Sequence, residues 1–121
     1  MSIKSCLATL LLAGCAALPS VGPVKVRDGA LVDLASMSLY VFDRDTEMNR
    51  SSCDGACARN WPPLAADADA VPVGQWYVIK RSDSVWQWAY KGKPVYLYAK
   101  DQKPGDRLGD GVNGLWHLAR P

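Results

Sequence analysis

The chain has 121 residues, a length typical of one domain, and 14 Lys and Arg residues against 12 Asp and Glu residues. The formal net charge is only +2. A nucleic-acid-binding domain normally carries a basic stripe, so this balance argues against a nucleic-acid partner. Five Trp and five Tyr residues can form the core of a small domain.

Residues 1–14 predict a signal peptide. Lys4 provides a basic start, and the apolar run that follows is far shorter than the roughly 20 residues that cross a bilayer. The run ends in Leu-Ala-Gly-Cys, which resembles the bacterial lipobox and implies cleavage before Cys15 and acylation of that cysteine. The alternative is a soluble secreted protein that is cleaved near Ala17.

Acyl chains on Cys15 are expected to hold the protein on a membrane, since each buried methylene contributes ~0.8 kcal/mol. Ala16 replaces the Asp that usually retains similar lipoproteins in the inner membrane, which favours the outer membrane of a Gram-negative host. Residues 15–23 predict a short tether, and residues 24–121 predict one β domain.

In the first half, residues 24–27 and 30–34 predict two strands joined by an Asp-Gly turn, and residues 39–42 predict a third strand. An irregular segment follows and contains Cys53 and Cys57. An export signal with an even pair of cysteines predicts a disulfide that fixes a local turn. A helical turn is expected just before Pro62-Pro63.

In the second half, the strands are expected at residues 75–80, 85–90, 95–98 and 115–118. Residues 91–94 predict a tight hairpin turn. Short strands at regular spacing, with no long amphipathic helix, predict an all-β fold.

Both halves contain the pattern Tyr-x-aromatic-x-x-Asp. The copies are Tyr40, Phe42, Asp45 and Tyr96, Tyr98, Asp101. Residues two apart lie on one face of a strand, so the rings are expected in the core, with each carboxylate accepting bonds from the following turn. A ligand site at the tyrosine hydroxyls is the alternative. The duplication predicts two pseudo-symmetric antiparallel repeats in a meander or sandwich, at about residues 24–64 and 75–119.

The motifs occur together with Cys-x-x-x-Cys before Trp-Pro-Pro, and with Tyr-x-Gly-x-Pro-x-Tyr-x-Tyr-x-x-Asp leading to Trp-His. This combination resembles a bacterial family of secreted-repeat lipoproteins over about residues 28–119. The resemblance implies the fold, lipidation and an envelope location. It provides no catalytic residues, because the family is largely of unknown function. The first copy lacks the Gly expected before Leu39.

Two weaker patterns resemble a cofactor site and a metal site, but each lacks a feature that such a site requires, so we expect no cofactor or metal. Gly-x-Gly-x-x-Gly at residues 109–114 lacks the following helix of a dinucleotide site. The acidic run at residues 43–47 resembles a calcium loop, but Met48 and Asp54 stand where Gly and Glu are required.

We expect a monomeric, non-enzymatic module that binds or scaffolds an envelope protein or glycan. Trp76, Trp86 and Trp88 are candidates for an exposed aromatic binding patch.

The alternative is a periplasmic redox or metal-handling protein, for copper or haem, that uses Cys53, Cys57 and His117. Hydrolysis is least expected, because His117 is the only histidine and has no evident catalytic partner.

Overall fold

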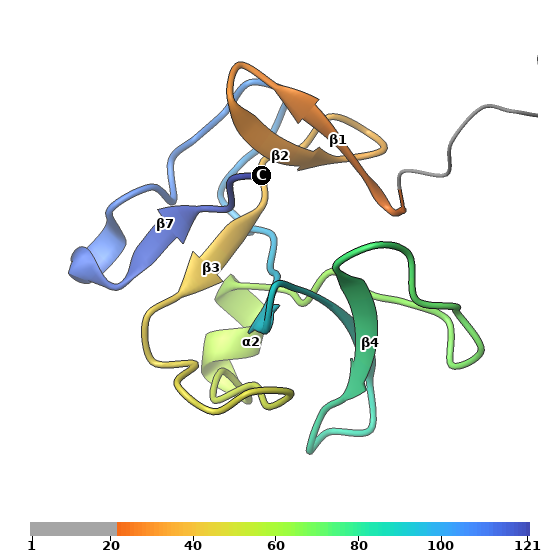
Figure 1. Ribbon diagram of the computed structural model, residues 1–121. Helices are drawn as coiled ribbons and strands as arrows, with labels where there is room; N and C mark the ends of the chain where they lie inside the picture. The colour runs from red at the N-terminus through yellow and green to blue at the C-terminus, as the bar shows by residue number, and fades with distance from the viewer. Residues whose placement is uncertain (1–21) are drawn as a thin grey trace, which may run out of the picture.

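The computed structural model describes residues 22–121, so the predicted signal peptide, Cys15 and most of the tether lie outside it. The all-β prediction is confirmed: seven short strands form three small antiparallel sheets in this part of the chain (Figure 1). No helix within it has the length and apolar character needed to cross a bilayer. The elements are β1 (Val24–Arg27), β2 (Ala30–Asp33), β3 (Tyr40–Phe42), helix α2 (Ala56–Asn60), β4 (Trp76–Lys80), β5 (Trp86–Tyr90), β6 (Lys93–Pro94), the 3-10 turn η1 (Val112–Gly114) and β7 (Trp116–Leu118).

Two tight turns form because their residues accept positive φ angles. Asp28 and Gly29, with φ of 48° and 76°, connect β1 to β2. Lys91 and Gly92, with φ of 49° and 86°, connect β5 to β6. Two successive positive φ angles match the turn type whose twist suits a hairpin. The second turn is therefore shorter than predicted, and a strand already begins at Lys93.

The predicted strand at residues 95–98 is wrong as a regular ladder, although the segment is extended. The structure has only the short β6 followed by two isolated bridges, from Tyr96 to Tyr40 and from Tyr96 to Pro63. The Leu97 amide donates to the Pro62 carbonyl at 2.7 Å. Residues 62 and 63 are both proline and have no N–H that could donate a hydrogen bond to the facing segment, so the ladder cannot continue. The corresponding pair in the other half, β3 with β7, has no proline and is regular.

The last segment of each repeat pairs with the backbone of the other repeat. Figure 1 shows β7, from the end of the chain, beside β3 of the first half. The Leu31 amide donates to the Ala119 carbonyl at 2.9 Å, and the Trp88 amide donates to the Leu64 carbonyl at 2.9 Å. Reciprocal contacts of this kind indicate a two-fold relation between the halves.

The core between the repeats is a stack of four rings. Trp61 and Trp116 lie at its centre, with ring centroids 3.8 Å apart and planes at 3°. Phe42 stacks on Trp116 at 4.1 Å, and Tyr98 stacks on Trp61 at 4.0 Å. Rings of the first and second halves therefore alternate, and the burial that stabilises one repeat requires the other.

Candidate functional site

The tyrosine of each motif copy is bonded to the aspartate of the other copy. The Tyr40 hydroxyl donates to Asp101 Oδ2 at 2.6 Å, and the Tyr96 hydroxyl donates to Asp45 Oδ2 at 2.6 Å. Both tyrosines are 0% exposed. Their backbones also exchange two hydrogen bonds, at 2.8 and 2.9 Å, so the two copies meet directly at the centre of the molecule.

The second oxygen of each aspartate holds the loop that follows. Asp45 Oδ1 accepts the Ser52 amide at 2.7 Å, and Asp101 Oδ1 accepts the Leu108 amide at 3.0 Å. Both amides lie seven residues beyond their aspartate. Each carboxylate thus joins a loop of its own repeat to a tyrosine of the other.

Burial raises the pKa of both motif tyrosines above the ordinary value of 10.0. The hydrogen bonds to Asp101 and Asp45 raise the pKa of Tyr40 and Tyr96 further, because a phenolate would face a carboxylate. The hydroxyls therefore remain protonated donors and are not prepared to act as nucleophiles or bases.

This arrangement predicts a loss of stability in alkali. Above about pH 10, tyrosines of the unfolded chain release protons that Tyr40 and Tyr96 retain in the folded state. The free energy of unfolding is therefore expected to be unaffected by these groups below that pH and to fall as pH rises through their raised pKa values. Urea unfolding at about pH 8 and about pH 11 measures the decline.

Tyr77, whose pKa burial also raises, contributes to the same decline, so the comparison must be made between variants. In Tyr40→Phe and in Tyr96→Phe, the free energy of unfolding is expected to fall less steeply with rising pH, although both substitutions lower stability at neutral pH. A slope identical to that of the parent protein in both variants would contradict the assignment.

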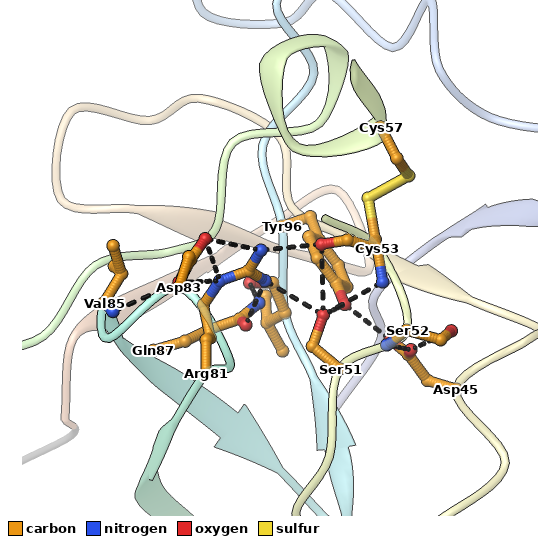
Figure 2. A network of polar contacts seen from close by, with 11 residues as sticks. Asp45, Ser51, Ser52, Cys53, Cys57, Arg81, Asp83, Val85, Gln87 and Tyr96 are labelled. Carbon is orange, nitrogen blue, oxygen red and sulfur yellow. Dashed lines mark hydrogen bonds and ion pairs between the residues drawn. A yellow bond between two sulfur atoms is a disulfide. The ribbon is translucent and has the colours of Figure 1, made fainter. Parts of the chain in front are cut away.

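The buried guanidinium of Arg81, in the second half, connects to the tyrosine–aspartate pairs through a network of hydrogen bonds (Figure 2). Arg81 Nη1 donates to Ser51 Oγ and to Gln87 Oε1, each at 2.9 Å, and Nη2 donates to the Cys53 carbonyl at 2.6 Å. Asp83 accepts from Nε and Nη2 at 3.1 Å. Every branch of the guanidinium is therefore used, as a buried cation requires.

The Arg81 network reaches the motif residues through one hydroxyl. Ser51 Oγ lies 2.6 Å from the hydroxyl of Tyr96, which in turn is bonded to Asp45. The hydrogen bond from Arg81 lowers the pKa of Asp83 below its ordinary value. Arg-x-Asp between two predicted strands carries no local signal of burial, so the sequence did not indicate the buried position of Arg81.

A surface depression of about 780 Å³ lies over this network. It is lined by the loop at residues 44–54 and by residues 80–82, and a second depression of about 550 Å³ shares Met48 and Asn49 with it. Charges of both signs line the first depression. They come from Arg44, Glu47, Arg50, Asp54 and Lys80.

The three tryptophans of the proposed binding patch do not have equal access to solvent. Trp76 is only 5% exposed and belongs to the second core cluster, where it stacks on Tyr90 at 4.7 Å. Trp88 packs against the same cluster and is half-buried. Trp86, also half-buried, has Lys80 over its ring at 5.6 Å.

The predicted disulfide is confirmed between Cys53 and Cys57, at the start of α2. His117 lies on β7, and its Nε2 is 2.8 Å from Oδ2 of Asp43. Residues 22–121 contain no group of three or more His, Cys, Asp or Glu side chains that could hold a metal ion. Cys53, Cys57 and His117 are therefore not part of a metal-holding group of this kind within this range.

Interlocked β repeats around exchanged tyrosine–aspartate pairs define a duplicated all-β module. A family described as a secreted repeat of unknown function matches the chain at residues 22–65 and again at residues 77–120. These matches cover more than half of the chain, and the protein belongs to this family. The resemblance drawn from the motifs is thus confirmed. No curated protein and no solved structure matches the chain at a significant level.

Proposed function

We propose that the protein is an envelope lipoprotein, acylated at Cys15, that acts as a non-enzymatic binding or scaffolding module. A location in the outer membrane is proposed for a Gram-negative host. The secreted character of the family and the lipobox-like Leu-Ala-Gly-Cys support this proposal.

One observation supports the proposal that the module is non-enzymatic. The motif groups that could perform chemistry are engaged in joining the two repeats: the hydroxyls of Tyr40 and Tyr96 are bonded to Asp101 and Asp45, and their pKa values are raised. The motif residues that occur in both halves therefore stabilise the fold.

The first depression lies where the two halves differ in structure, which makes it the better candidate for a binding surface. One wall includes Lys80 to Ser82, at the start of the β4–β5 connection. The corresponding hairpin of the first half has only the two-residue turn after Arg27. The depression offers charged and polar groups of both signs, which suits a polar partner such as an envelope protein or glycan.

Site-specific photocrosslinking in the native envelope tests the binding role. A crosslinker at Met48, which is 74% exposed and lines both depressions, is expected to give a discrete adduct. Val71 is the matched control, because it is 73% exposed and lines neither depression. Absence of an adduct at Met48, or the same adduct at Val71, would contradict a partner at this surface.

Mass spectrometry of the exported protein tests the anchor. The parent protein is expected to carry the mass of its acyl chains and to sediment with membranes. Cys15→Ser is expected to lose both properties, whereas Cys6→Ser, within the predicted signal peptide, is expected to retain them. An exported parent protein without acyl mass would refute the anchor.

A further inference from the structure

Four cationic side chains gather at the β1–β2 hairpin. Lys25 and Arg27 lie on β1 and are exposed. Arg107 and Arg120 come from the second repeat and are attached to the hairpin backbone. Arg107 Nη2 donates to the carbonyl of Arg27 at 3.1 Å, and Arg120 Nη1 donates to that of Gly29 at 3.1 Å.

None of these four cations forms an ion pair within 4.0 Å with a carboxylate of residues 22–121, although Asp28 and Asp106 are adjacent to Arg27 and Arg107 in sequence. Among residues 22–121, the ion pairs within 4.0 Å involve other cations, namely Arg50, Arg81, Lys103 and His117. Arg107 and Arg120 bond to carbonyl oxygens, which do not neutralise their charge. In the corresponding β4–β5 hairpin, the buried Arg81 instead forms an ion pair with the partly exposed Asp83.

Protection of an edge strand explains only part of this cluster. Charged residues on an exposed edge such as β1 commonly prevent pairing with another chain, and Lys25 and Arg27 suit that role. Arg107 and Arg120 lie outside β1, so edge protection does not require them. Val26, between the two β1 cations, is 61% exposed but lies on the opposite face of the strand from them.

The hairpin is also close to the proposed anchor along the chain. Seven residue steps separate Cys15 from Gly22, the first described residue, and span at most about 25 Å when fully extended. An acyl chain at Cys15 therefore keeps β1, which begins two residues later, within reach of the bilayer surface.

We propose that the β1–β2 hairpin lies against the anionic headgroups of the membrane that holds the protein. This inference rests on the proposed acylation of Cys15. Lys25, Arg27, Arg107 and Arg120 contact lipid phosphate. Each basic residue near an anionic surface strengthens contact by about fivefold at moderate salt, and the attraction decays within a Debye length.

Lysine labelling of the acylated protein in vesicles tests this orientation. In vesicles of phosphatidylglycerol and phosphatidylethanolamine, Lys25 is expected to be acetylated several-fold more slowly than in phosphatidylcholine vesicles. Lys91, which is exposed and lines the second depression, is the internal control and is expected to react equally in both. High salt is expected to abolish the protection of Lys25.

The double variant Arg107→Gln and Arg120→Gln is expected to lose most of the protection, while Lys100→Gln, at another exposed position, is expected to keep it. Equal labelling of Lys25 in both vesicles, in a protein shown by mass to be acylated, would overturn the inference and leave the anchor intact. A protein without acyl mass would instead refute the proposed function.

Discussion

Replacing Trp116 by alanine is expected to lower the free energy of unfolding by about 3–5 kcal/mol. Trp116 is buried, stacks on both Trp61 and Phe42, and meets the ring of Tyr96 edge-on at 5.1 Å. Its removal leaves a cavity at the contact between the repeats and breaks the ring stack in the middle. Urea unfolding followed by far-ultraviolet circular dichroism measures the change.

Trp86→Ala is the matched control, since that ring is half-buried and lies outside both core clusters. Its expected cost is about 1 kcal/mol, as for a substitution outside the core. Equal costs for Trp86→Ala and Trp116→Ala would contradict the central role of the ring stack.

Replacing Arg81 by methionine is expected to cost about 3 kcal/mol. Methionine retains much of the apolar stem but leaves the Cys53 carbonyl and the Gln87 amide oxygen buried without their donor. The free energy of unfolding measures this cost. The loop that carries Ser51 is also expected to exchange its amide hydrogens faster, since its contact with the second repeat is lost.

Asp83→Asn separates the ion pair from the buried hydrogen bonds. The Asp83 side chain is 39% exposed, so its loss is expected to cost about 1 kcal/mol or less. If Asp83→Asn destabilised the protein as much as Arg81→Met, the exposed ion pair, rather than the buried carbonyl and amide contacts, would be the main contribution of the arginine.

Local signals predicted the elements well. The positive-φ turn at Asp28-Gly29, the short strands and the Cys53–Cys57 disulfide depend on residues close together in sequence, and the structure contains them. The strand expected at residues 95–98 was wrong because its regularity depends on what lies opposite. Pro62-Pro63 is the partner there, and the pairing could not be read from either segment alone.

Long-range contacts were the part that one sequence could not supply. The duplication indicated that Tyr40 and Tyr96 are equivalent, but gave no sign that each bonds to the aspartate of the other copy, 61 and 51 residues away. Burial of Arg81 likewise depends on Ser51 and Cys53 of the first repeat. Such pairings follow from the three-dimensional exchange of segments, which leaves no periodic pattern.

Double-mutant cycles on the two motif copies test the exchange most directly. Tyr→Phe and Asp→Ala substitutions are combined in pairs, and the coupling is taken from the free energies of unfolding. We expect a coupling of about 1–3 kcal/mol for Tyr40 with Asp101 and for Tyr96 with Asp45. The pairs within one copy, Tyr40 with Asp45 and Tyr96 with Asp101, are expected to be additive within about 0.5 kcal/mol. Strong coupling within each copy and additivity between copies would contradict the interlocked arrangement.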